Sequence, residues 1–173
     1  MKYIVTSSFG NDSIALIQYM HENHKGEFIV LYNDTGWARK DWPARVANAS
    51  KVCFEMGVTV HITKSIGMEA IVRKNKGWPM PASKMQWCTM HLKEGPSNDF
   101  YAKHDPECES IIVTGRRRAE SQNRASLPKM QEESKKHGGR DVYNPLVNFD
   151  EAERDIYIKR FGLEPLNHQS MEC

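Results

Sequence analysis

Four short runs rich in β-branched and aromatic residues, separated by stretches long enough for helices, constrain the fold of this chain more than any other feature. The runs are YIVTS (3–7), FIVLYND (28–34), VTVHIT (58–63) and SIIVTG (110–115). Strands that alternate with helices predict an α/β fold, with a single doubly wound, mostly parallel sheet and helices on both faces. The 173 residues fit one domain, and the sequence has no internal repeat and no interdomain linker.

The segments between and after these runs predict the covering helices. Apolar spacing and capping residues place them at 12–24, 41–56, 66–74, 88–103 and 150–161. Gly57 is expected to end the second helix, and Gly95-Pro96 to interrupt the fourth. Asp150 and Glu153 have the spacing of a capping box before the last helix. The polar stretch 124–140 is expected to be irregular, and DVYNPL (141–146) to hold a short strand.

The N-terminus and the hydropathy of the chain bear on its location. No apolar run approaches the ~18 residues that a membrane span needs. The opening MKYIV turns polar at Thr6, so it lacks the core of a signal peptide. We therefore expect a cytoplasmic protein with no membrane partner.

The chain enters its first helix through an unusually polar loop, SSFGNDS (7–13). Helix starts expose unpaired N–H groups and partial positive charge, so they attract phosphate or sulfate. Gly10 allows close approach of a ligand to the backbone, and Ser7, Ser8 and Ser13 add hydroxyl donors. The alternative is that Asp12 or Ser13 merely caps the helix while Gly10 turns the chain.

Other polar segments also follow predicted strands, where ligands of open parallel sheets bind. They are Asp34-Thr35-Gly36 and the stretch from Gly115 to Arg118. From Gly115 to Arg140 the chain carries eight Lys or Arg against three Glu, a local net charge of +5. On a nearly neutral protein this indicates one anionic ligand site, with a solvated loop as the alternative. A nucleic-acid surface is disfavoured because no aromatic platform accompanies the arginines.

The four cysteines lie far apart and include no C-x-x-C pair. They are Cys53, Cys88, Cys108 and Cys173. In a cytosolic chain we expect free thiols, ligands or nucleophiles more than disulfides. These spacings do not support a closed zinc site of four cysteines.

Several motifs, in order along almost the whole chain, resemble one family. Ser8 to Ser13 spells S-x-G-x-D-S, which resembles the pyrophosphatase (PP) loop of the adenine-nucleotide α-hydrolase superfamily. The later motifs resemble the phosphoadenosine phosphosulfate (PAPS) reductase family of that superfamily. They are D-T-G (34–36), W-C-T-x-x-L-K-x-x-P (87–96), G-x-R-x-x-E-S-x-x-R (115–124), and N-P-L (144–146) followed by a helix and GLEPLN (162–167).

The resemblance implies roles for individual residues. Lys93, Arg117 and Cys173 are the implied catalytic residues: the first two neutralise the anion and its leaving group, and the Cys173 thiolate is the nucleophile. The implied nucleotide-binding residues are Ser7, Ser8, Phe9, Gly10, Asn11, Asp12, Ser13, Asp34, Thr35, Gly36, Gly115, Arg117, Glu120 and Arg124. Because seven residues separate Arg117 from Arg124, the two would share one face of a helix.

The resemblance leaves three functions open. The lead is thiol-dependent reduction of PAPS to sulfite, with a thioredoxin-type dithiol protein as partner. The alternatives are an ATP pyrophosphatase or adenylating sulfurtransferase that uses Mg²⁺, with Asp12 at the metal, and a non-catalytic nucleotide-binding module. Cys88 and Cys173 are candidate ligands of an iron–sulfur cluster or zinc, although a complete cluster normally takes four cysteines. Family members usually continue past LEPLN into a segment with further cysteines, so that segment is expected to be missing. Homo-oligomer formation stays open.

Overall fold

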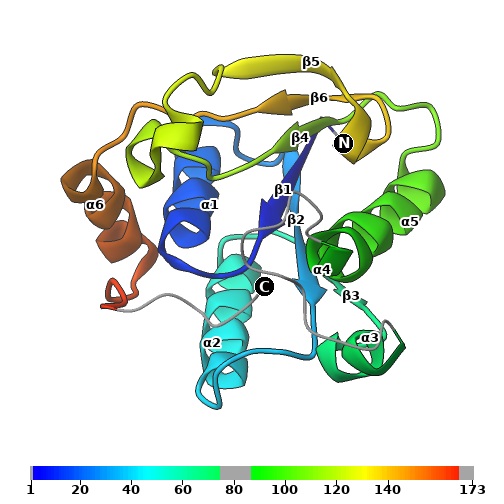
Figure 1. The fold of residues 1–173 in the computed structure, drawn as a ribbon. Coiled ribbons are helices and arrows are strands. Elements are labelled where there is room, and N and C mark those ends of the chain that lie inside the picture. Colours follow the sequence, from blue (N-terminus) through cyan, green and yellow to red (C-terminus); the bar gives the residue numbers. More distant parts are fainter. Residues whose placement is uncertain (1, 75–86, 168–173) are drawn as a thin grey trace.

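The computed structural model describes residues 2–74 and 87–167, and its centre is one open sheet of six strands (Figure 1). The strand order is β3-β2-β1-β4-β6-β5. Five strands run parallel, and β5 pairs antiparallel with β6. The bounds are β1 Tyr3–Ser7, β2 Phe28–Asp34, β3 Val60–Lys64, β4 Ile111–Val113, β5 Met130–Ser134 and β6 Arg140–Tyr143. The predicted fold class is confirmed.

Strand β1 lies where the order of strands reverses. The chain moves from β1 outward to β2 and β3, then returns to place β4 on the other side of β1. Tyr3 of β1 is therefore in register with Phe28 of β2 and with Ile111 of β4. Connections that leave β1 and β4 in opposite directions open a crevice beyond their carboxyl ends, where ligands of such sheets bind.

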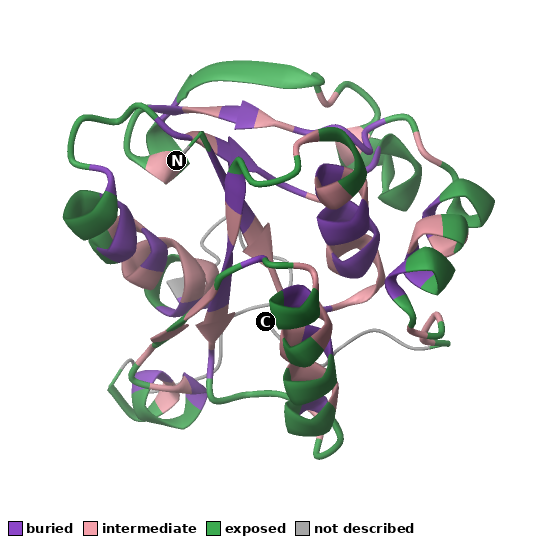
Figure 2. Ribbon diagram, turned by 180° about the vertical axis from the view of Figure 1, so that it is seen from behind, coloured by how far each residue is buried: buried purple, intermediate pink, exposed green. Residues whose placement is uncertain are grey.

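Two hydrophobic clusters cover the two faces of the sheet, and Figure 2 shows the buried residues concentrated between the layers. Tyr3 and Val5 of β1 pack with α1, α2 and α6, whereas Ile4, between them, packs with α5. This alternation is the period of two expected of a strand that is buried on both sides. In Figure 1, α1, α2 and α6 lie on one side of the sheet and α5 on the other.

The helices begin and end largely where the sequence predicts. Their bounds are α1 Asn11–Asn23, α2 Trp42–Glu55, α3 Met68–Lys74, α4 Trp87–Thr89, α5 Gly95–His104 and α6 Glu151–Phe161. Gly57 follows α2 at φ 74°, in the left-handed region that glycine favours. The capping box of α6 is confirmed: Asp150 Oδ1 accepts from the Glu153 amide at 2.8 Å, and Glu153 Oε2 accepts from the Asp150 amide at 2.9 Å. None of the helices in the described ranges is long and apolar enough to cross a membrane.

Three parts of the fold differ from the sequence-based expectation. The stretch 124–140 contains β5, whose exposed polar residues carry no alternating pattern. Gly95-Pro96 does not break its helix: a π-helix, η1 (Met90–Glu94), joins α4 to α5, and Pro96 lies in the first turn of α5, directly after the π-helix. Arg117 and Arg124 do not share a helix face, because two short 3₁₀ turns, η2 (Arg118–Glu120) and η3 (Gln122–Arg124), replace the helix.

The segment after β4 packs directly against the start of α1. A Cβ atom added to Gly115 would lie 2.9 Å from the carbonyl oxygen of Asp12 and 3.1 Å from its carbonyl carbon. Both atoms belong to the backbone and cannot rotate away. Only glycine therefore fits at position 115 while β4 and α1 keep this spacing.

We expect Gly115→Ala to lower the free energy of unfolding by about 1–3 kcal/mol, because the added methyl group pushes two backbone segments apart. Urea denaturation measures the change. Gly10→Ala is the matched control: Gly10 has φ −72°, and its added Cβ would meet only the Ser8 hydroxyl, at 3.3 Å. Equal losses in the two variants would contradict the close approach at Gly115.

Candidate functional site

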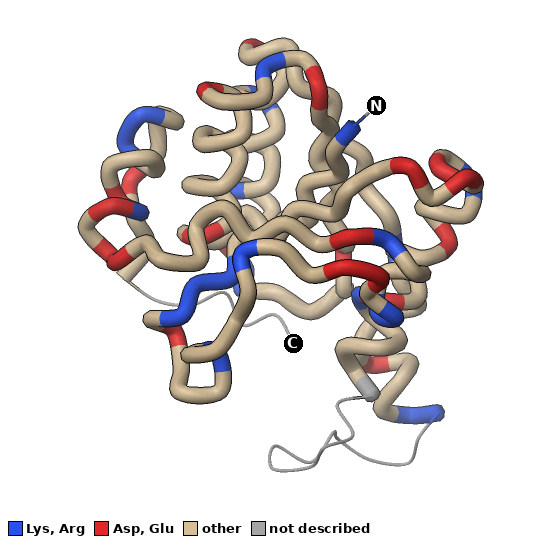
Figure 3. Tube along the Cα trace, turned by 90° about the horizontal axis from the view of Figure 1, so that it is seen from above, with Lys and Arg blue, Asp and Glu red and all other residues tan. Residues whose placement is uncertain are grey.

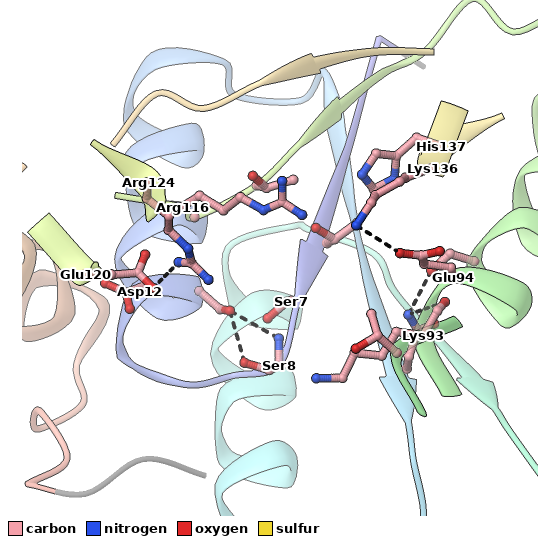
Figure 4. Close-up of a pocket in the computed structure, with 17 residues that line it drawn as sticks. Ser7, Ser8, Asp12, Lys93, Glu94, Arg116, Glu120, Arg124, Lys136 and His137 are labelled. Atoms are coloured by element: carbon pink, nitrogen blue, oxygen red, sulfur yellow. Dashed lines mark hydrogen bonds and ion pairs between the residues drawn. The ribbon is translucent and has the colours of Figure 1, made fainter. Parts of the chain in front are cut away.

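A cavity of about 330 Å³ opens at the carboxyl ends of β1 and β4, as the reversal of strand order predicts (Figure 4). Its wall contains polar and cationic side chains from segments far apart in the sequence. The loop after β1, η1, the segment after β4 and the segment after β5 all contribute. Among the residues that line it are Ser7, Ser8, Ser13, Lys93, Arg116 and Arg124. This composition suits an anionic ligand.

The serines of the loop hold the loop itself and do not cap α1. Ser13 Oγ accepts from the Ser8 amide at 3.1 Å, Ser7 Oγ from the Phe9 amide at 3.0 Å, and Ser8 Oγ from the Gly10 amide at 3.3 Å. Gly10 is the N-cap residue, and no side chain caps the helix. The interpretation of Asp12 or Ser13 as a simple cap is therefore wrong. The N–H groups of the first turn of α1 lack intrahelical acceptors and are available beside the cavity.

Two residues of the predicted binding loop position it from outside the cavity. Phe9 is buried, with φ 57°, and its ring lies 5.4 Å from the ring of Tyr32. The Asn11 side chain donates to the Leu166 carbonyl and accepts from the Leu166 amide, both at 2.9 Å. Asn11 thus ties the start of α1 to the segment after α6. Asn11 and Gly10 line a second cavity, of about 760 Å³, which shares Ser8 and Ser13 with the first.

The D-T-G segment after β2 also lies outside the lining of both cavities. Asp34 Oδ1 accepts from the Gly36 amide at 3.0 Å, and Gly36 has φ 65°. Thr35 is 1% exposed. These contacts make the segment a tight turn at the end of β2. Its predicted contact with a nucleotide stays a prediction.

Arg117, predicted to contact the anion, is instead a buried tie between segments. Its Nε donates to Asp12 Oδ1 at 2.5 Å and its Nη1 to the Phe149 carbonyl at 3.2 Å, and its side chain is 3% exposed. Arg154 of α6 lies 4.0 Å from the same Asp12 oxygen. Arg117 lines the second cavity and does not line the first. Asp12 therefore joins three segments of the chain at one carboxylate.

Lys93 and Arg124 do line the first cavity, as predicted. Lys93 lies on η1, and π-helical turns are frequent at functional sites. Arg124 forms an ion pair with Glu120, and Glu120 Oε1 also accepts from the Arg117 amide at 2.7 Å. Figure 4 shows this pair next to the serine loop. Glu120 thus orients Arg124 toward the loop.

The sequence motifs missed three basic residues of the cavity, namely Arg116, Lys136 and His137. Arg116 occupies a variable position of the family motif and is followed by two further arginines. Figure 3 shows that basic residues also form continuous stretches of the trace. Burial lowers the pKa of Arg116, and Arg124 adds to the effect, against Glu120 and Glu94. Burial and the charges of Arg116, Lys136 and Arg140 lower the pKa of His137 to about 4. The local charge of +5 is the signal that could have found these residues.

The described residues do not fit a protein-bound metal. The carboxylates around the cavity are each paired with a cation: Asp12 with Arg117, Glu120 with Arg124, and Glu94 with Lys136. The predicted contact of Asp12 with Mg²⁺ stays a prediction. Within residues 2–74 and 87–167, no group of three or more His, Cys, Asp or Glu side chains could hold a metal ion.

The cysteines are dispersed in the fold. Cys53 is a buried free thiol whose pKa burial raises to about 12, and Cys108 is an exposed free thiol. Cys88 is buried, at 4% exposed. Cys173, the predicted nucleophile and second candidate ligand, lies outside the described residues.

We expect Arg117→Met to lower the free energy of unfolding by about 1–3 kcal/mol, because Asp12 loses its buried partner. Urea denaturation measures the change. Arg118→Met is the control, since Arg118 is exposed and its side chain, within the described part of the chain, bonds to the Leu127 carbonyl and Asn148. Its effect is expected within about 0.5 kcal/mol. An unchanged stability of the Arg117 variant would refute the structural role.

Comparisons with known proteins agree with this fold. A family model described as phosphoadenosine phosphosulfate reductase domain matches residues 2–168. The PAPS reductase of Candida auris, solved as a phosphate complex, has a TM-score of 0.65 at 21% identity, covering 95% of this chain and 75% of that one. The U34-tRNA thiolase of Methanococcus maripaludis, solved with its 4Fe–4S cluster, also scores 0.65, at 16% identity over 96% of this chain and 59% of that one. At these identities the solved structures share the fold.

A curated relative is similar over part of the chain. An uncharacterized 37.8 kDa protein of Escherichia phage 186 is 31% identical over 90 residues. The match covers 49% of this chain and 26% of the phage protein, so it spans about a quarter of that relative's length. The family model covers nearly the whole chain and the fold agrees with it, so the chain belongs to the phosphoadenosine phosphosulfate reductase family.

Proposed function

We propose that this protein binds an adenine nucleotide by its phosphate or sulfate end in the 330 Å³ cavity and reduces phosphoadenylyl sulfate to sulfite. One observation carries the proposal: the start of α1, the three serines of the loop before it and the cations Lys93 and Arg124 line the same cavity. It lies at the point of the sheet where nucleotides bind in α/β folds.

Two kinds of group complement the anion in this proposal. The first turn of α1 supplies backbone N–H groups and the positive end of the helix dipole. Lys93 supplies a compact point charge, and Arg124 a planar guanidinium that can bond two oxygens of one phosphate or sulfate. Because these groups are fixed by the fold before the ligand arrives, they stabilise charge that develops on the leaving phosphate.

The proposed reaction has two steps. A cysteine thiolate, for which Cys173 is the candidate, attacks the sulfur of phosphoadenylyl sulfate: a sulfur–sulfur bond forms, the sulfur–oxygen bond breaks, and its electron pair leaves with adenosine 3′,5′-bisphosphate. A thioredoxin-type dithiol then attacks the protein-bound thiosulfonate. Sulfite leaves, the protein thiol is restored, and the dithiol is oxidised to a disulfide.

The pairing of the carboxylates favours this chemistry over the ATP pyrophosphatase alternative. ATP chemistry depends on a divalent cation, which proteins hold through carboxylates. Asp12, Glu94 and Glu120 are each engaged with a basic side chain. Transfer of a sulfonyl group to a thiolate requires no such ligand and uses the cationic wall directly.

The decisive measurement offers the full chain two substrates. Phosphoadenylyl sulfate with reduced thioredoxin is expected to yield sulfite, and labelled ATP with Mg²⁺ is expected to yield no pyrophosphate. Pyrophosphate release without sulfite would overturn the reductase proposal in favour of the ATP pyrophosphatase. Nucleotide binding without turnover would indicate a non-catalytic nucleotide-binding module. No binding of either nucleotide would refute the proposal.

Two substitutions test the assigned residues. We expect Lys93→Gln to slow sulfite release about 100-fold, the scale seen when one group that stabilises developing charge is removed. Lys103→Gln, an exposed lysine in the last turn of α5, is the control and is expected to leave the rate unchanged. Cys173→Ser is expected to abolish sulfite release, and Cys108→Ser, at an exposed free thiol, to preserve it. Full activity of the Cys173 variant would remove that residue from the mechanism.

A further inference from the structure

Two side chains of α2 hold the backbone of the serine loop, residues 7–13 (Figure 1). Trp42 Nε1 donates to the Ser8 carbonyl at 3.2 Å, and Arg45 Nε donates to the next carbonyl, that of Phe9, at 2.7 Å. Neither Trp42 nor Arg45 lines the first or the second cavity. Both side chains therefore act on the loop from the side of α2, where they do not face a ligand bound in either cavity.

These two hydrogen bonds decide which way the N–H groups of the loop point. In a trans peptide the C=O and the following N–H point in opposite directions, and the described residues include no cis peptide bond. With the carbonyls of Ser8 and Phe9 turned toward α2, the amides of Phe9 and Gly10 point away from it. These amides donate to Ser7 Oγ at 3.0 Å and to Ser8 Oγ at 3.3 Å, and both serines line the first cavity. The contacts with α2 thus set the side on which the loop presents its donors.

The backbone conformation of the loop depends on such support. Phe9 has φ 57°, in the left-handed region that an aromatic residue rarely adopts, and this conformation persists only where the surroundings fix it. The Phe9 ring is fully buried and packs against Tyr32. The buried ring fixes the side chain, and the bond from Arg45 fixes the peptide plane that follows it.

The bonding of Arg45 is explained better by orientation of the loop than by stability of the fold. Arg45 is half-buried, burial lowers the pKa of its guanidinium, and its buried Nη2 atom has no hydrogen-bond partner among the described residues. A partly buried cation with an unpaired N–H contributes little net stability. A cation on the Phe9 carbonyl does polarise that peptide, which makes its N–H, that of Gly10, a stronger donor.

We infer that Trp42 and Arg45 are positioning residues of the anion site: they hold two successive carbonyls of the serine loop against α2 and so aim its N–H groups and serine hydroxyls toward the cavity. The inference rests on the proposed nucleotide binding, and it adds residues that none of the sequence motifs includes. Trp42 and Arg45 act through Ser7, Ser8 and Gly10 and do not touch the nucleotide. Removing their bonds weakens binding of the phosphate or sulfate and leaves the cations of the cavity in place.

A matched pair of substitutions at Arg45 isolates its hydrogen bond. Glutamine places an N–H donor as many bonds from the backbone as the Nε of arginine, whereas methionine has the same length and no donor. Both remove the charge, and both are good helix formers, so α2 keeps its structure. We expect Arg45→Met to weaken calorimetrically measured binding of adenosine 3′,5′-bisphosphate to the full chain about tenfold, and Arg45→Gln less than about threefold.

A second cation of the same helix provides the control. Lys51 has a side chain that is 77% exposed, and its Nζ lies 3.7 Å from Glu55. Lys51→Met removes a positive charge of α2 without touching the serine loop, and it is expected to keep the original affinity. A loss of affinity through net charge alone would appear in this variant and in Arg45→Gln as well.

The amide proton of Gly10 distinguishes a positioning role from lost packing. In nuclear magnetic resonance spectra of the isotope-labelled protein without ligand, we expect Arg45→Met to shift this proton upfield, because its peptide is no longer polarised. Arg45→Gln fills the same space and is expected to keep most of the original shift. Trp42→Phe, which keeps an aromatic ring and removes the indole N–H, is expected to shift the Phe9 amide proton in the same direction.

The outcomes separate this inference from the proposed function. Equal affinities of Arg45→Gln and Arg45→Met, or an unmoved Gly10 amide proton in Arg45→Met, would overturn the positioning role and leave nucleotide binding intact. If the original protein does not bind the bisphosphate, the proposed nucleotide binding is refuted. The shift of the Gly10 amide proton then decides alone whether Arg45 orients the loop.

Discussion

The ion pair between Asp12 and Arg117 is the constraint on which the rest of the site depends. Asp12 opens α1, Arg117 follows β4, and the carboxylate also lies near Arg154 of α6. Gly115 adds a backbone contact between the same two segments. The wall of the cavity depends on how the start of α1 and the segment after β4 lie against each other, and this group of contacts holds the two together. The ion pair fixes the orientation of the two segments, because the planar guanidinium and the carboxylate bond only in certain directions.

This arrangement divides the work among neighbouring arginines. Arg117 is buried and forms an ion pair with Asp12, whereas Arg116, one residue earlier, lines the cavity. The extended backbone at Arg117, φ −124° and ψ 146°, sends successive side chains to opposite sides. Arg117, on one side of the segment, thus holds the segment in place, and Arg116, on the other side, presents its charge to the cavity.

The sequence was sufficient for the strands and for the end of the sheet that holds the site, because both follow from local patterns. β1 and β2 match their predicted bounds, and the capping box of α6 formed as the spacing of Asp150 and Glu153 indicated. β5 could not be predicted, because most of its residues are exposed and show no alternation of apolar and polar residues. It pairs with β6 through the backbone, which does not depend on the type of side chain. The orientation of Arg117 likewise depends on Asp12, 105 positions earlier in the chain, which no local pattern reveals.

The π-helical turn at Met90–Glu94 has a consequence for how this region tolerates change in length. A π turn takes more residues than an α turn and leaves carbonyl groups displaced from the ordinary ladder. Asn33 of β2 bonds the displaced Lys93 carbonyl at 3.2 Å and the Ser97 hydroxyl at 2.7 Å. Deleting one residue here would restore an α-helix and rotate Lys93 by about 100° away from the cavity. Residues 90–97 are therefore intolerant of insertion or deletion.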